Sequence, residues 1–239
     1  MSLASHKAAK LVKPPQRVFE QKLLKRIDLP HEDTGDGRFY VLPETGERFM
    51  SVTTKLGRLM PSDWLAEWKS RVGEQRAAHI SGVAKSRGTA LHTAAERYLL
   101  GDPEWATDIM PATRTLFCGT DGTSGIKGHL DKSLTTLYGI EVPLYSRRIK
   151  AAGRADLLSD WEGETAVVDF KGSSYPKELS GIEGYFLQTA AYGIMMHELY
   201  GIAPKKLVVV IGVEHEDAQV FVQESREWVK RVHGMFVAK

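Results

Sequence analysis

Alternation of apolar and polar residues divides the chain into a largely helical first half and a second half in which strands dominate. The expected elements are strands at 38–42 and 48–52, helices at 53–59, 63–80, 85–100 and 108–118, a helical stretch reaching 137, strands at 138–145, 148–159 and 165–171, a helix at 181–200, strands at 206–213 and 218–223, and a last helix N-capped by Ser225. The unbroken apolar run Leu207–Ile211 indicates a strand buried on both faces. This order predicts an α/β fold with a mixed central sheet flanked by helices.

Two of these strands, at 148–159 and 165–171, form a predicted hairpin that gathers charged side chains. Because side chains alternate between the two faces of a strand, Asp169 and Lys171 share one face, and the apolar residues between them take the other. Asp156 precedes Asp169 by thirteen positions. Across a hairpin this spacing lets both carboxylates bind one metal ion.

Carboxylate oxygens are hard ligands that suit Mg²⁺ or Mn²⁺. A lysine beside the ion adds a compact positive charge that can stabilise charge developing on phosphorus oxygens. The alternative is a solvated strand face, on which Asp and Lys form an incidental cross-strand pair. The apolar pair Val167–Val168 before Asp169 favours the metal site, because a carboxylate at a buried strand end requires partners.

Two predicted helices carry further polar residues near their apolar stripes. Gln188 and Tyr192 lie four residues apart in the 181–200 helix and are neighbours on one face. His92 lies at the edge of the apolar stripe of the 85–100 helix. Alternatively, Tyr192 and His92 are ordinary core side chains and Gln188 lies at the surface; imidazole is nevertheless a common metal ligand.

Together these pieces resemble the PD-(D/E)xK nuclease superfamily, in its RecB-type exonuclease branch. The motifs occur in the family's order: Gly88-Thr-Ala-Leu-His92, Glu141, Gly153-x-x-Asp156, Asp169-x-Lys171 and Gln188-x-x-x-Tyr192. The resemblance spans most of the chain and is greatest to the mitochondrial genome maintenance exonuclease and its bacteriophage relatives. It implies a restriction-endonuclease-like core with an N-terminal helical lobe.

The resemblance also implies roles for individual residues. The implied metal-binding set is Asp156, Asp169, the main-chain carbonyl of Phe170, His92 and Glu141. The implied catalytic residues are Asp156, Asp169, Lys171 and Glu141. Gln188 and Tyr192 match a pair that supports the site and touches the nucleic acid backbone. One departure is visible: Gly172 stands where many relatives have threonine, which removes a hydroxyl beside the ligands but leaves the ligands in place.

Charge is distributed unevenly although the formal net charge is only +2 and the pI about 8.5. The first 26 residues carry seven Lys or Arg residues against one acid, and a second basic group precedes Asp156. Such runs are often solvated segments, but beside a phosphodiesterase centre they would bind DNA phosphates in a salt-dependent way. The expected DNA-binding residues are Gln188, Tyr192, Arg154, Arg147, Arg148 and Ser173.

Length and cysteine usage set further bounds. With 239 residues and 42% hydrophobic content, we expect a basic arm at 1–30, with a short helix near 18–26, followed by a single domain at 31–239. Within it, a helical lobe at about 53–137 precedes a catalytic core at about 138–239. The single cysteine, Cys118, rules out an intrachain disulfide and the four-cysteine iron–sulfur cluster found in some RecB-type relatives.

No run of eighteen apolar residues predicts a membrane span, and no signal-peptide core is visible. The resemblance implies a cytoplasmic protein of a phage or bacterial host. A mitochondrial location fits less well, because Pro14-Pro15 interrupts the helix that a transit peptide requires.

The expected activity is phosphodiester hydrolysis assisted by one or two Mg²⁺ or Mn²⁺ ions. The resemblance implies single-stranded or flap DNA with a free end, cut in replication, recombination or repair, with replication or recombination proteins as further partners. Candidate base-stacking side chains are Trp64, Trp68, Tyr185 and Phe186, although their helical spacing favours a place in the core. Two alternatives stay open: a structure-specific endonuclease with the same site, and a non-cleaving DNA-binding module with the same fold.

Overall fold

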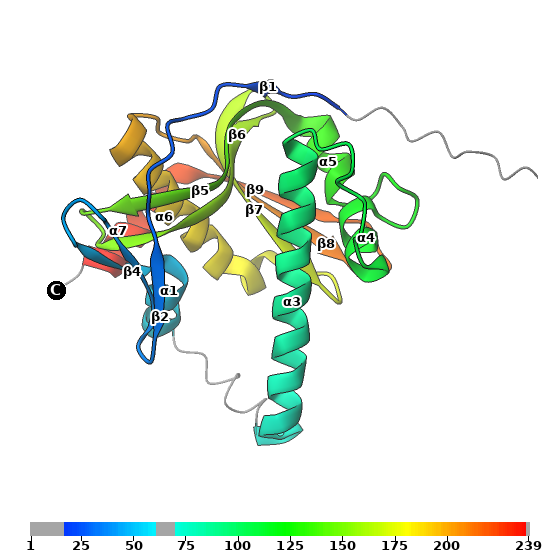
Figure 1. The fold of residues 1–239 in the computed structure, drawn as a ribbon, viewed down its shortest axis with the longest axis horizontal. Coiled ribbons are helices and arrows are strands. Elements are labelled where there is room, and N and C mark those ends of the chain that lie inside the picture. The colour runs from blue at the N-terminus through cyan, green and yellow to red at the C-terminus, as the bar shows by residue number, and fades with distance from the viewer. Residues whose placement is uncertain (1–16, 61–69, 238–239) are drawn as a thin grey trace, which may run out of the picture.

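The computed structural model describes residues 17–60 and 70–237, which form a twisted sheet between two layers of helices (Figure 1). The strands are β1 (Glu20–Gln21), β2 (His31–Thr34), β3 (Gly37–Val41), β4 (Arg48–Ser51), β5 (Leu134–Ser146), β6 (Ala151–Trp161), β7 (Glu164–Ser173), β8 (Lys206–Val213) and β9 (Gln219–Glu224). The helices are α1 (Val52–Leu59), α3 (Glu74–Leu99), α4 (Pro111–Cys118), α5 (Ile126–Ser133), α6 (Glu183–Tyr200) and α7 (Ser225–Val237), and a 3₁₀ turn, η1 (Leu179–Ile182), precedes α6. No helix within these ranges is both long and apolar enough to cross a membrane.

The sheet is mixed. Its main path runs β2-β3-β4-β6-β7-β8-β9, and β5 pairs with β6 on one side and with β1 on the other. The pairs β1–β5, β4–β6 and β7–β8 are parallel, and the remaining pairs are antiparallel. Strand β6 therefore has three neighbours: β5 along its whole length, β4 at its start and β7 over its second half.

Each face of the sheet is covered by helices. On one face, α1, α6 and α7 pack over a core that includes Phe186 and Phe236. On the other face, α3, α4 and α5 pack over a core that includes Leu91 and Phe117. Full burial of such a side chain contributes about 1.5–3 kcal/mol. The predicted α/β class, with a mixed central sheet flanked by helices, is confirmed.

Most predicted elements form close to their expected positions, and β8 matches its predicted range residue for residue. Two differences concern helix ends. One continuous helix, α3, replaces the second part of the 63–80 helix and the whole 85–100 helix, while residues 61–69 lie outside the described part of the chain. The helical stretch expected to reach 137 ends at Ser133, because Leu134 and Leu137 bury their side chains as the start of β5.

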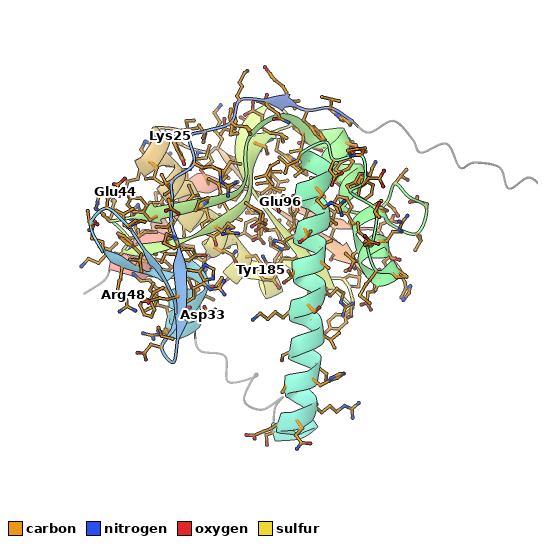
Figure 2. All side chains as sticks on the ribbon, viewed as in Figure 1. Lys25, Asp33, Glu44, Arg48, Glu96 and Tyr185 are labelled. Atoms are coloured by element: carbon orange, nitrogen blue, oxygen red, sulfur yellow. The ribbon has the colours of Figure 1, made fainter. Side chains whose placement is uncertain are left out.

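The part of the predicted N-terminal arm that the structure describes, residues 17–30, lies along the edge of β5; we call it the strap. The helix predicted near 18–26 is wrong, because the backbone amides of Lys22 and Leu24 donate outward to the carbonyls of Leu137 and Tyr138, each at 2.8 Å. Figure 2 shows Lys25 where the strap passes over the sheet. Farther along, Leu29 is buried in a small third core with Phe49.

Helix α3 extends beyond the sheet. Its N-terminal half projects from the body of the molecule, opposite the strands β2 to β4 (Figure 1). From Glu74 to Ser86 its side chains are exposed apart from Ala77, whereas Leu91 and Tyr98 in the second half are fully buried. Asp33 and Arg48 lie on the strands that face the helix, and Glu96 lies on the helix itself (Figure 2). The part of α3 that carries His92 is thus fixed by the core.

Candidate metal centre

The sheet divides where β6 and β7 part, and the first residues beyond that point are Asp156 and Asp169. The two strands pair as far as Leu157 and Val168. Beyond them, β7 continues beside β8 alone, up to Ser173, while β6 continues beside β5. Among the described strands, the backbone of β7 after Val168 therefore has no partner on the β6 side.

Phe170 shows how this loss of pairing is compensated. Its N–H donates to Asp156 Oδ2 at 2.8 Å, so a carboxylate replaces the missing strand carbonyl. Its carbonyl oxygen lies 3.0 Å from His92 Nε2. The main-chain oxygen predicted as a metal ligand is therefore directed to the side chain of His92, and the Phe170 ring is buried on the same side of the sheet, in the core beneath α3.

Glu141 lies on the other side of Asp156. In the β5–β6 ladder, the residues before and after Glu141 pair with the residues after and before Asp156, so Glu141 lies opposite Asp156. It has a φ of 49°, in the left-handed region that non-glycine residues rarely adopt, and its side chain is 17% exposed. Glu141, Asp156 and Asp169 thus occupy facing positions on three neighbouring strands.

His92, from α3, meets this row of acids. Its Nδ1 lies 3.3 Å from Asp156 Oδ1 and 3.4 Å from Glu141 Oε1. His92, Glu141 and Asp156 each place one ligand atom within 4.8 Å of the others. The surroundings of His92 are polar, unlike those of the core histidine that the sequence left open.

The charges at this cluster favour a cation. Burial lowers the pKa of His92, but its hydrogen bonds to Asp156 and Glu141 outweigh burial and raise that pKa to about 10. Burial raises the pKa of Asp156, while the His92 hydrogen bond opposes this and leaves it below its usual value. One imidazolium thus balances two carboxylates and a carbonyl. Three oxygen donors and one imidazole nitrogen are a donor set that fits Mg²⁺ or Mn²⁺, so the residues present fit a divalent ion of that class.

Asp169 and Lys171 lie beside the cluster as an ion pair. Asp169 Oδ2 is 2.5 Å from Lys171 Nζ but makes no hydrogen bond of good geometry with any described residue, and Oδ1 accepts from Gln188 Nε2 at 3.0 Å. Asp169 is 1% exposed, and this burial raises its pKa to about 6 despite the opposing charge of Lys171. Asp169 therefore interacts with Lys171 and Gln188 and is not part of the cluster formed by His92, Glu141 and Asp156.

Tyr192 packs against the glycine of the Gly153-x-x-Asp156 motif. A Cβ at Gly153 would lie 2.6 Å from Tyr192 Cε1 and 2.8 Å from the phenol oxygen, so any side chain there would displace the ring. Burial first, and then the charges of Asp156 and Asp169, raise the pKa of Tyr192 well above its ordinary value. The phenol keeps its proton and can donate toward the acids.

A cavity of about 560 Å³ lies over the cluster, between α3 and the strands β3 and β4. The residues that line it include His92, Glu141, Gly153 and Tyr192, together with the basic residues Arg38, Lys85 and Arg154. Asp33 holds Arg38 through two hydrogen bonds of 2.8 and 3.0 Å. Sequence reasoning found Arg154 but missed Arg38 and Lys85, because nothing local to these residues relates them to the acids.

The other predicted DNA-binding residues lie apart from the cluster. Arg147, at the β5–β6 turn, forms an ion pair with Glu47 at 2.6 Å. Arg148 lines a different cavity of about 570 Å³ between α6 and α7. Ser173 ends β7, and its hydroxyl donates to the carbonyl of Tyr175 at 2.6 Å. The structure therefore does not bring Arg147 and Arg148 to the predicted site.

The candidate stacking residues divide in a similar way. Trp64 and Trp68 lie outside the described residues. Phe186 is fully buried against Trp228, which contradicts its prediction as a stacking surface. The Tyr185 ring lies under Lys171 Nζ at 5.1 Å, next to the ion pair.

Gly172, at which the sequence departs from the pattern it resembles, packs closely against α4. A Cβ at this position would lie 3.2 Å from Leu116 Cδ1, on the α4 side of the sheet. Gly212 pairs with Gly172 on β8, and a Cβ there would lie 2.5 Å from the Leu116 carbonyl oxygen. Residue 172 thus faces the helical core on the side of the sheet opposite to Asp169 and Lys171.

Comparisons with known proteins give distant likenesses. No family model matches the chain, and no curated protein matches it. Among solved structures, SSO0001 is 14% identical with a TM-score of 0.34, over 79% of this chain and 84% of that one. A candidate exonuclease from Eubacterium rectale is also 14% identical, with a TM-score of 0.40, over 64% of this chain and 63% of that one. At such low TM-scores neither likeness assigns a function to this chain.

Proposed function

We propose that this protein is a metal-dependent deoxyribonuclease that hydrolyses phosphodiester bonds of single-stranded or flap DNA from a free end. One observation carries the proposal: Glu141, Asp156 and the Phe170 carbonyl converge on His92, with the Asp169–Lys171 pair adjacent and a cavity with basic walls above. The acidic side chains can bind a divalent cation, and the lysine and the basic residues of the cavity can bind an anionic substrate such as a DNA phosphate. Metal-assisted phosphodiester hydrolysis needs both.

The residues that would hold Mg²⁺ or Mn²⁺ are His92, Glu141, Asp156 and the carbonyl of Phe170, with Asp169 as a further ligand once it turns from Lys171. When bound, a divalent ion supplies Lewis-acid polarisation of a phosphoryl oxygen. His92 must then give up its proton, because a protonated imidazole has no lone pair to offer.

Lys171 would stabilise the negative charge that develops on the phosphate. Burial lowers the pKa of Lys171, but Asp169 and Asp156 outweigh burial and keep that pKa above its ordinary value, so the side chain is an ammonium at neutral pH. Gln188 would hold Asp169 in place through its 3.0 Å hydrogen bond. Arg38, Lys85 and Arg154 would bind the phosphates of the strand that enters the cavity.

The finer assignments are part of the proposal. The motifs support a relationship to the mitochondrial genome maintenance exonuclease and its phage relatives, and so a role in DNA replication, recombination or repair in the cytoplasm of a phage-infected or bacterial cell. The preference for a strand end over an internal bond is implied by the motif resemblance.

The test uses 5′-labelled and 3′-labelled single-stranded oligonucleotides and a circular control, in Mg²⁺, Mn²⁺ and EDTA. We expect metal-dependent loss of the linear strands alone, abolished by Asp169→Asn. Asp160→Asn is the matched control, because Asp160 lies on β6 but binds Tyr138 instead of the cluster. Cutting of the circle would replace the exonuclease with an endonuclease, and binding without metal-dependent cutting would contradict both.

A further inference from the structure

Arg26, in the strap, is bonded to the backbone on which Glu141 stands. Its Nη1 donates to the carbonyl of Ile140 at 3.0 Å and its Nη2 to the carbonyl of Glu141 at 2.9 Å. These bonds join residues more than a hundred positions apart. Neither motif nor spacing connects Arg26 with the predicted site.

The two bonds coincide with an unusual backbone. Along a regular strand, successive carbonyls point to opposite edges, yet Ile140 and Glu141 present both oxygens to one guanidinium. The left-handed φ of 49° at Glu141 accounts for this, because a positive φ changes the relative orientation of the peptide groups before and after the residue. Residues held in such a conformation persist only where their surroundings determine it.

The strap is fixed on both sides of Arg26. Before it, the Leu24 amide donates to the Tyr138 carbonyl at 2.8 Å, and the Tyr200 hydroxyl donates to the carbonyl of Lys25 at 2.9 Å. After it, Leu29 is 5% exposed in the third core. The guanidinium is therefore presented to β5 by an anchored segment, although the Arg26 side chain lies at the surface.

We infer that Arg26 is a positioning residue of the metal centre, which holds Glu141 in its left-handed conformation and so directs the Glu141 carboxylate to His92 and Asp156. This inference rests on the proposed function, since it assigns the cluster to a divalent ion. The strap is then a structural part of the site, although it lies far from the other site residues in the sequence. Residues that orient metal ligands typically change metal affinity or activity ten- to a hundredfold when removed.

The test compares Arg26→Ala, Arg26→Lys and Arg17→Ala in the full chain, with Mn²⁺ affinity measured calorimetrically without DNA. Arg17 is the matched control, because its Nη2 also donates from the strap to β5, at the Leu134 carbonyl at 2.9 Å, away from Glu141. We expect Arg26→Ala to raise the Mn²⁺ dissociation constant about tenfold. The dissociation constant of Arg26→Lys should lie between those of wild type and Arg26→Ala, because an ammonium lacks the planar guanidinium that spans two carbonyls. Arg17→Ala should match wild type in affinity, with a melting temperature lowered as in Arg26→Ala.

A double-mutant cycle separates positioning from general stability. In a Glu141→Gln background, Arg26→Ala should raise the dissociation constant no further, because the carboxylate through which it acts is gone. Unchanged Mn²⁺ affinity in Arg26→Ala, an equal loss in Arg17→Ala, or full additivity with Glu141→Gln would each overturn the inference. If the wild type binds Mn²⁺ without cutting labelled DNA, the nuclease proposal alone fails, and the titrations still decide the role of Arg26.

Discussion

Helix α3 carries Tyr98 and His92 into the molecule, and the two side chains differ in the balance of donors and acceptors around them. Tyr98 is fully buried and donates its hydroxyl to Asp131, which also accepts from Lys127 Nζ at 2.7 Å. One carboxylate there receives two donors. His92, less than two turns earlier, offers two ring nitrogens to Asp156, Glu141 and the Phe170 carbonyl.

The difference lies in the ratio of donors to acceptors. A buried polar cluster stabilises a fold when each acceptor has a donor, and it costs free energy when acceptors are in excess. The Tyr98 cluster is balanced and joins α3 to α5. The His92 cluster has more acceptor oxygens than donors, and a divalent cation would correct that imbalance. The comparison therefore predicts that equivalent changes in the two clusters have opposite effects.

The largest effect should come from Asp156→Asn. We expect DNA cleavage to fall at least about a hundredfold, because a cation loses a charged ligand. In EDTA the melting temperature should hold or rise, since the amide keeps the shape and reduces the excess of negative charge. Oligonucleotide cleavage and thermal melting measure the two effects. A clear loss of stability in EDTA would show that the acid is mainly structural and would break the contrast.

Lys171→Ala should separate turnover from metal binding. We expect the single-turnover rate to fall about a hundredfold, as for the loss of one preorganised charge donor. Mn²⁺ affinity, measured by calorimetry, should be equal or higher, because buried Asp169 loses its neighbouring cation. A variant that retains full activity would contradict the role proposed for Lys171.

Addition of Mn²⁺ should stabilise the folded state through the His92 cluster alone. At a free concentration about a hundred times the dissociation constant, linkage gives about 2.7 kcal/mol of stabilisation. Thermal melting should show this shift for wild type and for Asp131→Asn, and no shift for Asp156→Asn. Stabilisation of all three proteins would mean that the ion binds somewhere else.

The smallest effect should be that of Asp131→Asn on stability. The amide keeps one acceptor for Tyr98 but loses the charge that attracts Lys127, so the free energy of unfolding should fall by about 1 kcal/mol. Chemical denaturation measures this loss, and DNA cleavage should be unchanged. A large loss of activity would extend the functional site along α3 and remove the distinction between the clusters.

Local pattern was enough to predict the strands of the core and much of the site. Alternation separated Asp169 and Lys171 from the buried Phe170, and the hairpin brought Asp156 opposite Asp169. These relations depend only on the alternation of side chains along a short strand, which can be read directly from the sequence. His92 needed the family resemblance as well, because helical periodicity alone favoured a core residue.

Predictions of which basic residues lie at the site were wrong where residues close in sequence lie far apart in the folded chain. Arg147 and Arg148 precede Asp156 by fewer than ten positions, but each strand residue adds about 3.3 Å, so the hairpin carries them away to its turn. Arg26 and Arg38 come from segments far from the acids in sequence and reach the site only through tertiary folding. No local pattern distinguishes such arginines from solvated ones.

The glycine pair on β7 and β8 links two positions in their evolution. Leu116 of α4 packs on the backbone of Gly172 and Gly212, and a Cβ at 172 would lie 3.2 Å from Leu116 Cδ1, so a side chain there requires a small shift of this leucine. A larger residue at 172 is therefore accommodated more easily beside a smaller residue at 116. The two positions are expected to vary together in proteins that share this helix placement.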